Sequence, residues 1–267
     1  MKDQRVKEIH LLALAGLFVS IVSTTSYAQF ADSVVSYSPG TGVNPSYTNP
    51  NAALGAPTTF IGYQNADPFN PPYQASDIVG LGVNGSITLQ FNTPIQNNPS
   101  NPYGLDFIIF GHAGFNEDFS TSTTDGTLFT GGTADVRVSV SADGLTFYTL
   151  NLALTPMVDG LYPTDASGNP VLPVNPALTA ADFAGKDLAG IQALYAGSAG
   201  GAGFDLSWAL DGNNQSVPLS AVNYVRLDDL SGVAYIDAIS IVPEPSVGSL
   251  ALLAGAALLA RARRNRP

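Results

Sequence analysis

The sequence predicts an all-β protein, an antiparallel β-sandwich with long ordered loops and one or two short helices. Seven short segments have the alternating or β-branched character of strands. Glycine and proline supply 27 and 19 of the 267 residues, which suits the many turns between such strands. The sequence holds no cysteine, so disulfide-stapled folds and thiolate metal sites are excluded.

Period-two alternation identifies the strands. Residues 86–91 and 135–141 alternate strictly, so each should lay one apolar face on a core. The sequence Ala-Asp-Gly at residues 142–144 predicts a hairpin closed by a glycine-containing loop. The remaining predicted strands are residues 34–37, 105–110, 146–152, 222–227 and 235–242.

The segment 179–196 is the one region with helical character, since it is rich in alanine and leucine. Thr179 and Asp187 are its candidate N-caps, and Gly185 and Gly190 predict two short helices in place of one long one. Residues 39–72 and 156–176 are rich in proline, asparagine and glycine. We expect both to be ordered loops, because aromatic and aliphatic side chains in the first of them need somewhere to pack.

The N-terminus has the three parts of a secretory signal peptide. Residues 1–10 carry three basic side chains, residues 11–22 are apolar, and Ser26-Tyr27-Ala28 places small residues where a signal peptidase cuts. We therefore expect residues 1–28 to be a signal peptide, cleaved between Ala28 and Gln29. The alternative is a buried core helix.

The C-terminus is membrane-directed. Residues 247–260 are fourteen residues without a charge, which is short for a transmembrane helix of about 20 residues. Clustered arginines stay cytoplasmic, so everything before the helix lies outside. The basic cluster consists of Arg261, Arg263, Arg264 and Arg266.

This tail, residues 242–267, resembles the PEP-CTERM sorting signal of Gram-negative bacteria that produce exopolysaccharide. Pro243-Glu244-Pro245 precedes the hydrophobic helix and the arginine-rich end in the order that the signal has. The resemblance implies an exosortase as partner and processing near the motif. It also implies secretion across the inner membrane and residence at the cell surface or in the extracellular matrix, with a membrane anchor before processing. The alternative is a plain single-pass anchor.

Between the two signals, residues 29–241 form one predicted ectodomain of roughly 213 residues, enough to bury its own core. It holds 18 of the 21 acidic residues and three basic ones, Arg137, Lys186 and Arg226. A surface this negative repels phosphate, so nucleic acid is not an expected partner, whereas divalent cations suit it.

The ectodomain resembles bacterial cell-surface proteins with a discoidin-like, galactose-binding-type jelly roll. In those relatives an acidic Glu-Asn pair follows the strand that matches residues 106–110, whereas Gly111-His112 stands here. The resemblance is carried by Tyr37-Ser38-Pro39-Gly40, Asn51-Ala52-Ala53-Leu54-Gly55, residues 86–91, residues 106–110, residues 138–144, Gly203-Phe204-Asp205-Leu206 and Ile236-Asp237-Ala238-Ile239.

Calcium is the one cofactor that the sequence suggests. Asp106, Asp205 and Asp237 are the candidate ligands, because calcium takes six to eight oxygens that separate loops can supply. The alternative for Asp106 and Asp237 is that each caps a strand or pairs locally. The Glu117-Asp118 pair is better explained as a solvated loop.

Catalysis has little support in the sequence, and we expect no enzyme. His112 is the one histidine of the predicted ectodomain, and a loop histidine is usually an ordinary polar residue. Asp228 and Asp229 are adjacent on a strand and so point to opposite faces. Trp208 could stack on a sugar, although a partly buried core position is the better interpretation.

The predicted function is therefore a non-catalytic, adhesive, exopolysaccharide-matrix or glycan-binding role at the cell surface. An extracellular carbohydrate-active enzyme using Asp/Glu pairs is the alternative, and a purely structural matrix component is a third. Binding of polysaccharide without release of reducing sugar separates the first from the second.

Overall fold

The computed structural model describes residues 29–244. The predicted signal peptide up to Ala28 lies outside these residues, as do Pro245, the hydrophobic helix and the arginine cluster. Among the described residues, no helix is long and apolar enough to cross a membrane.

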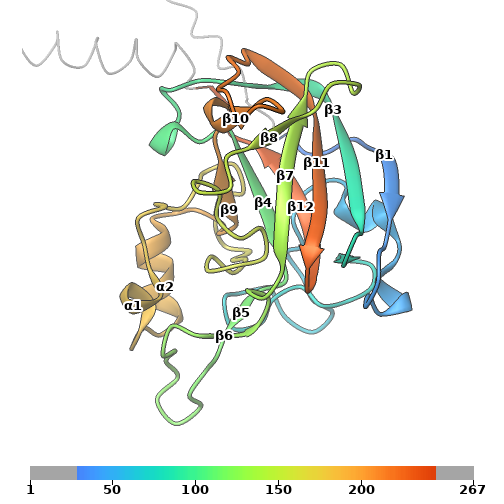
Figure 1. Cartoon of the computed structure of the whole chain (residues 1–267). Helices are drawn as coiled ribbons and strands as arrows, with labels where there is room; N and C mark the ends of the chain where they lie inside the picture. Colours follow the sequence, from blue (N-terminus) through green and yellow to red (C-terminus); the bar gives the residue numbers. More distant parts are fainter. Residues whose placement is uncertain (1–28, 245–267) are drawn as a thin grey trace, which may run out of the picture. The chain divides into compact units, whose positions relative to one another are not determined.

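The described chain is mostly β, with antiparallel sheets and two short α-helices, as the sequence predicts (Figure 1). Four short 3₁₀ helices (η) lie in the connections. The elements are β1 Ser33–Ser38, η1 Pro45–Tyr47, η2 Pro50–Ala53, β2 Val79–Gly82, β3 Ser86–Gln96, η3 Pro102–Gly104, β4 Phe107–Gly111, β5 Gly114–Phe115, β6 Leu128–Thr130, β7 Asp135–Ser141, β8 Tyr148–Leu150, α1 Ala180–Phe183, α2 Leu188–Tyr195, β9 Ala202–Phe204, η4 Leu206–Trp208, β10 Ala209–Leu210, β11 Ala221–Ser231 and β12 Val233–Ile241.

Two sheets carry the fold. One has the order β1-β3-β11-β7-β8-β10 and the other the order β2-β12-β4-β9. β11 is central in the first sheet, where Leu227 pairs with Ile87 of β3 on one side and with Val138 of β7 on the other. β12 is central in the second sheet, between β2 and β4. The short hairpin β5-β6 forms a third sheet below them (Figure 1).

The main core lies between the two large sheets. It combines residues of the first sheet, such as Leu89 and Val225, with residues of the second, such as Phe107 and Ile236, all fully buried. Alternation puts these side chains on the inner faces, and the buried apolar area stabilises the pair of sheets. Residues 29–244 belong to one compact unit around this core, so this part of the chain can be studied as a separate fragment.

Each of the seven predicted strands is confirmed, with boundaries that differ by zero to five residues. The sequence did not reveal β2, because its four residues Val79–Gly82 are all buried and therefore do not alternate. It also did not reveal β5, β6, β9 and β10, which are two or three residues long.

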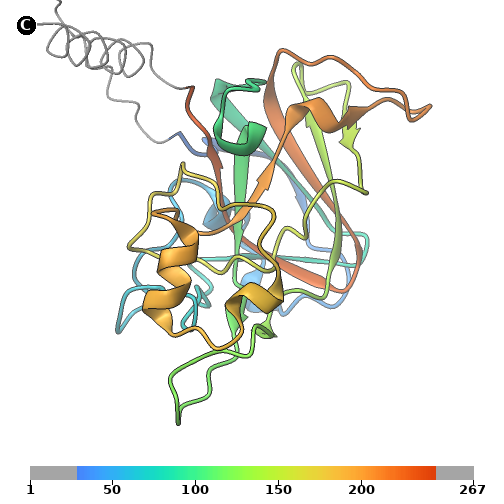
Figure 2. The same ribbon diagram turned by 90° about the vertical axis from the view of Figure 1, so that its left-hand side faces the viewer.

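The two predicted short helices are also confirmed. The carboxylate of Asp182 accepts hydrogen bonds from the backbone and hydroxyl of Thr179 at the start of α1 (both 2.8 Å). The side chain of Asp187 caps α2 by accepting from the Gly190 amide at 2.8 Å. Figure 2 shows both helices on one side of the domain. They enclose a second apolar cluster, formed by Phe115, Val174, Phe183, Ile191 and Tyr195.

Candidate functional site

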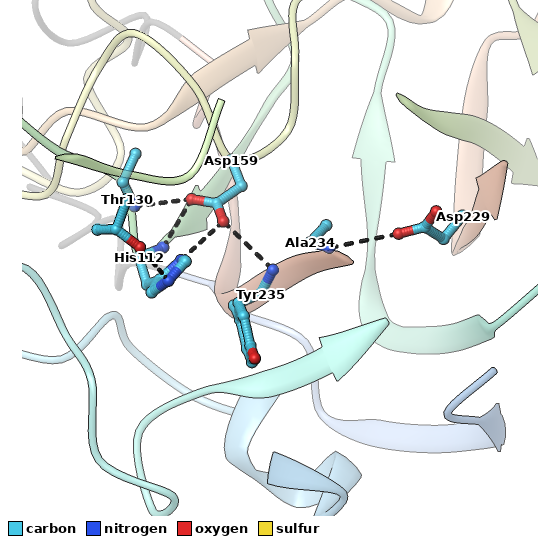
Figure 3. Close-up of polar contacts among 7 residues, drawn as sticks. His112, Thr130, Asp159, Asp229, Ala234 and Tyr235 are labelled. Atoms are coloured by element: carbon cyan, nitrogen blue, oxygen red, sulfur yellow. Dashed lines mark hydrogen bonds and ion pairs between the residues drawn. The ribbon is translucent and has the colours of Figure 1, made fainter. Parts of the chain in front are cut away.

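One end of the domain brings together four polar and aromatic side chains from distant parts of the chain (Figure 3). His112 directly follows β4, Thr130 ends β6, Asp159 lies in the loop after β8, and Tyr235 lies near the start of β12. Antiparallel neighbours in the sheet place the end of β4 beside the start of β12, since Gly111 pairs with Ile236. The topology therefore assembles this group.

Asp159 organises the group. Its Oδ1 accepts hydrogen bonds from the backbone amides of His112 (2.8 Å) and Ala113 (2.7 Å). Its Oδ2 lies 2.8 Å from Nδ1 of His112 and accepts from the Tyr235 amide at 3.3 Å. Because a carboxylate accepts hydrogen bonds, the proton of the neutral imidazole belongs on Nδ1. Asp159 is buried, so these bonds fix the ring firmly.

The other ring nitrogen of His112 faces Thr130. With the proton on Nδ1, Nε2 accepts a hydrogen bond from the Thr130 hydroxyl. The ring of Tyr235 packs against the imidazole at a centroid distance of 4.4 Å and an angle of 58°. Asp159, His112 and Thr130 therefore form a hydrogen-bonded chain that ends at a hydroxyl group.

Two glycines make room for this chain. A Cβ on Gly111 would collide with the carboxylate of Asp159. Gly131 has φ +74°, and a Cβ there would lie 2.7 Å from that of Ala113. The Gly111-His112 pair thus lets the carboxylate of Asp159 approach the end of β4.

His112 and Thr130 line a surface hollow of about 200 Å³, which we call the aromatic hollow. Three of its aromatic residues are strongly exposed: Tyr63 is 65 % accessible, Phe129 56 % and Tyr73 46 %. Concave sites with aromatic walls and a few fixed polar groups are typical of small-molecule binding. The hollow is lined by Ile61, Tyr63, Phe69, Asn70, Pro71, Tyr73, His112, Phe129 and Thr130.

A second, polar hollow of about 480 Å³ adjoins the first, since Phe69 and Asn70 line both. It lies between the loop that precedes β2, the β5-β6 loop and the N-terminus of α2. Its acidic side chains are Asp67, Glu117 and Asp187. The two hollows therefore lie on either side of Phe69 and Asn70.

The predicted calcium ligands do not converge. Asp106 is fully buried, with Oδ1 accepting from the Asn98 amide (3.0 Å) and the Asn101 side chain (3.1 Å), and Oδ2 from the Leu206 amide (2.9 Å). Burial raises the pKa of Asp106 to about 6, and the nearby charge of Asp205 adds to this rise. Asp205 itself caps η4 through the Ser207 amide.

Asp237 lies elsewhere, on β12, and accepts from the amide and the hydroxyl of Thr58 (both 2.9 Å). Burial raises its pKa to about 8. In the part of the chain that the structure describes, no three His, Asp or Glu side chains come together as a metal site would need. N–H and O–H donors surround Asp106 and Asp237, a set that does not fit a cation needing six to eight oxygens. Calcium binding itself is not tested by these contacts and stays a prediction. Melting curves measured with calcium and with a chelator test it: curves that separate support calcium binding, and curves that coincide contradict it.

Asp228 and Asp229 do not act together. Asp228 is paired with Arg226 (2.7 Å) and Arg137 (3.3 Å). Asp229 is buried, accepts weakly from the Ala234 amide at 3.3 Å, and has one oxygen without a hydrogen-bond partner (Figure 3). Burial raises its pKa to about 6. Trp208 packs, partly buried, against the main core, as predicted.

The two ends of the predicted mature ectodomain are neighbours. The amide of Ile241, the last residue of β12, donates to the carbonyl of Gln29 at 2.8 Å. The Val242 amide donates to the carbonyl of Asp106 at 2.9 Å, and Pro243 and Glu244 follow directly. The predicted sorting motif thus begins two residues after the end of β12.

Sequence analysis singled out His112 but missed its partners. Asp159 is 47 residues away and Thr130 is 18 residues away, and both lie in segments without a motif. The aromatic residues of the long loop at 39–72 were expected to pack. Several of them instead remain exposed, and that exposure is visible only in the folded chain.

No protein family matches this chain, and no curated protein is significantly similar to it. The functional argument therefore rests on the site.

Proposed function

We propose that this protein is a secreted, surface-sorted glycan-binding protein that acts without catalysis, and that the aromatic hollow is its binding site. The observation that carries the proposal is the combination of exposed aromatic side chains with a rigidly held polar chain, Asp159–His112–Thr130. Sugars have apolar faces and a rim of hydroxyl groups. Aromatic rings cover the faces, and fixed polar groups bond the rim.

The position of the hollow supports a role at the cell surface. Tyr235, beside His112, lies near the start of β12, and Ile241 ends the same strand about 20 Å further on at 3.3 Å per residue. A tail that continues from Ile241 would hold the domain at the end away from the hollow. In this proposal an exosortase processes the Pro243-Glu244-Pro245 tail, and the domain meets exopolysaccharide outside the cell.

We propose that the two antiparallel sheets are a discoidin-like jelly roll. The central places of β11 and β12, each paired on both sides with strands distant in sequence, support this assignment. An experimental structure whose strand connections do not trace two Greek keys would contradict it.

A second function, hydrolysis, is favoured by one observation. A hydroxyl bonded to a histidine that a buried aspartate orients is the arrangement of an activated nucleophile. Such an enzyme also needs N–H donors for the developing oxyanion. The amides of His112, Ala113 and Tyr235 all point at Asp159. Since these donors are occupied, binding is the better-supported function.

The test uses the soluble ectodomain, residues 29–245, and the exopolysaccharide of the native host. We expect co-sedimentation with the polymer, weakened about tenfold in Tyr63→Ala, because a lost stacking contact is worth about 1.4 kcal/mol. Tyr63 is 65 % exposed, so its removal should leave the melting temperature unchanged. Tyr103→Ala is the matched control: Tyr103 is 56 % exposed and lies before β4, at the opposite end of that strand from His112.

Two further measurements separate binding from hydrolysis. Reducing-sugar release, abolished by changing one Asp or Glu, would favour the carbohydrate-active enzyme. Release of ester-linked acyl groups, abolished by Thr130→Val, would favour a nucleophilic hydrolase. Binding without either release supports the proposed function. Equal binding by Tyr63→Ala and by the unaltered protein would contradict the aromatic hollow as the site.

A further inference from the structure

We infer that the glycan bound at the aromatic hollow is an uncharged polysaccharide, and that the site rejects polymers of uronic acids. This inference rests on the proposed function and names its ligand class. Three independent features of the two hollows carry it: the direction of the fixed hydrogen bonds, the position of the carboxylates and the position of the cations.

The fixed hydrogen bonds leave acceptor groups for a ligand. With the proton of the neutral imidazole on Nδ1, the Thr130 hydroxyl donates to Nε2 of His112, so the lone pairs of the hydroxyl oxygen remain for a ligand. The Asn70 side-chain amide donates to both oxygens of Asp67, at 3.1 and 3.2 Å, so its carbonyl oxygen remains. Acceptors of this kind bind the hydroxyl groups of a neutral sugar. They repel a carboxylate, which can only accept.

Negative charge surrounds the same depression. Asp67, Glu117 and Asp187 line the polar hollow that shares Phe69 and Asn70 with the aromatic hollow. Asp159 lies directly behind the imidazole of His112. A sugar chain that continues from the aromatic hollow along Asn70 passes these side chains. A carboxylate on each or every second sugar would meet them at close range, where like charges repel.

None of the three cations of the described residues lines either hollow. Arg137 and Arg226 both pair with Asp228 on β11. Lys186 directly precedes Asp187, and its side chain lies against Gly190 in the first turn of α2 without lining either hollow. In residues 29–244, neither hollow has a lysine or arginine in its lining. Recognition of an anionic sugar normally uses such a side chain.

The experiment compares soluble polymers of known charge by affinity electrophoresis and calorimetry with residues 29–245. Dextran, galactomannan and xyloglucan are the neutral probes, and alginate and polygalacturonate are the anionic ones. We expect at least one neutral polymer to bind, with affinity that Tyr63→Ala lowers about tenfold and that salt between 50 and 500 mM leaves unchanged. We expect each anionic polymer to bind at least tenfold more weakly.

A charge reversal at the polar hollow sharpens the test. Glu117→Lys should raise the affinity for polygalacturonate at least fivefold at low salt and lose this gain at high salt. Glu244→Lys is the matched control, because it changes the net charge equally at the far end of β12 and should have no effect. Anionic binding that equals neutral binding and depends on Tyr63 would overturn this inference while the proposed function stands. If neither the five polymers nor the host polymer binds, both this inference and the proposed function fail.

Discussion

At the scale of single residues, buried carboxylates hold the loops of this protein in place. Asp159 joins the end of β4 to the start of β12, Asp106 joins β4 to η4, and Asp237 joins β12 to the loop at Thr58. Each accepts N–H or O–H bonds that would otherwise be unsatisfied in the interior. Some of the acidic side chains therefore stabilise the fold, while others face the solvent.

Replacing Asp159 should disorganise the site and destabilise the fold. Asp159→Ala leaves the buried amides of His112, Ala113 and Tyr235 without an acceptor, at about 1–3 kcal/mol each. We expect a loss of roughly 3–6 kcal/mol, or about 2–4 °C of melting temperature for each kcal/mol. Differential scanning calorimetry measures it, with Asp135→Asn as the exposed control. A melting temperature within one degree of the unaltered protein would contradict this account of Asp159.

Stability should increase on acidification from pH 8 to pH 5. Burial raises the pKa of Asp237 to about 8 and those of Asp106 and Asp229 to about 6, above the unfolded value near 3.8. The folded chain then binds more protons than the unfolded chain between these values, so its stability falls as pH rises through this window. Relief of repulsion among the surface charges acts in the same direction.

Asp237→Asn isolates the buried group from the surface. Asparagine stays neutral and can still bond the amide and hydroxyl of Thr58, so the melting temperature of this variant should change less between pH 6 and pH 8. Asp32→Asn is an exposed change whose side-chain oxygen can still accept from the Asn92 amide, so it should leave the pH dependence as it is. The same slope in all three proteins would refute the role of Asp237.

At the scale of elements, close backbone contacts position the loop that precedes β2. The amide of Gly82, at the end of β2, donates to the carbonyl of Pro39 at 2.8 Å, and the Gly85 amide donates to Gly82. Gly40 has φ +73°, and a Cβ there would overlap the backbone of Gly82 and Gly85. The Pro39-Gly40 sequence directly after β1 is thus needed for the close approach of this loop to Gly82 and Gly85.

Gly40→Ala should therefore be strongly destabilising. It adds a clash with backbone, which cannot move aside, to the strain of a left-handed conformation. We expect a loss of about 3 kcal/mol or more in the free energy of unfolding, measured by urea denaturation. Gly212→Ala is the control, since a Cβ there meets nothing within 4 Å and its φ is not positive. Equal stability of the two variants would show that the backbone around Gly40 can accommodate a Cβ, and would contradict this prediction.

At the scale of the whole molecule, the ectodomain places both of its ends together. Gln29 and Ile241 are hydrogen-bonded, and the aromatic hollow lies by the opposite end of β12. The core and the hollow described above are built from residues within 29–244, and cleavage at the two predicted signals would leave all of these residues in place.

Protein from the native host should begin near Gln29 and end near Pro245. The Ser26-Tyr27-Ala28 exit and the Pro243-Glu244-Pro245 motif bracket residues 29–241, and the sequence predicts that each is a processing signal. Intact-mass spectrometry measures both ends at once. A mass that retains residues 247–267 would support the plain single-pass anchor instead. Glu244→Gln should impair the C-terminal cleavage, so that the measured mass includes residues 247–267. Asn92→Gln is the control and should leave this cleavage unchanged.

Local information was sufficient for much of the fold. Alternation over residues 135–141 predicts β7 because one face of a strand is buried and the other is not, and Thr179 and Asp187 predict the helix starts because short polar side chains bond free amides. Each of these signals is contained within a few neighbouring residues, so it can be recognised from the sequence alone. Fully buried β2 lacks such a signal, since a strand buried on both faces has no alternation.

The sequence by itself therefore determined the all-β class, seven of the strands, both helices and the strongly acidic character of residues 29–241. Only the tertiary structure decided which side chains meet: that His112 lies between Asp159 and Thr130, that Asp106 and Asp237 are separate, and that Tyr63 stays exposed. The reason is that antiparallel pairing brings together residues tens of positions apart. The pairing is set by burial of the whole core, and no local pattern encodes it.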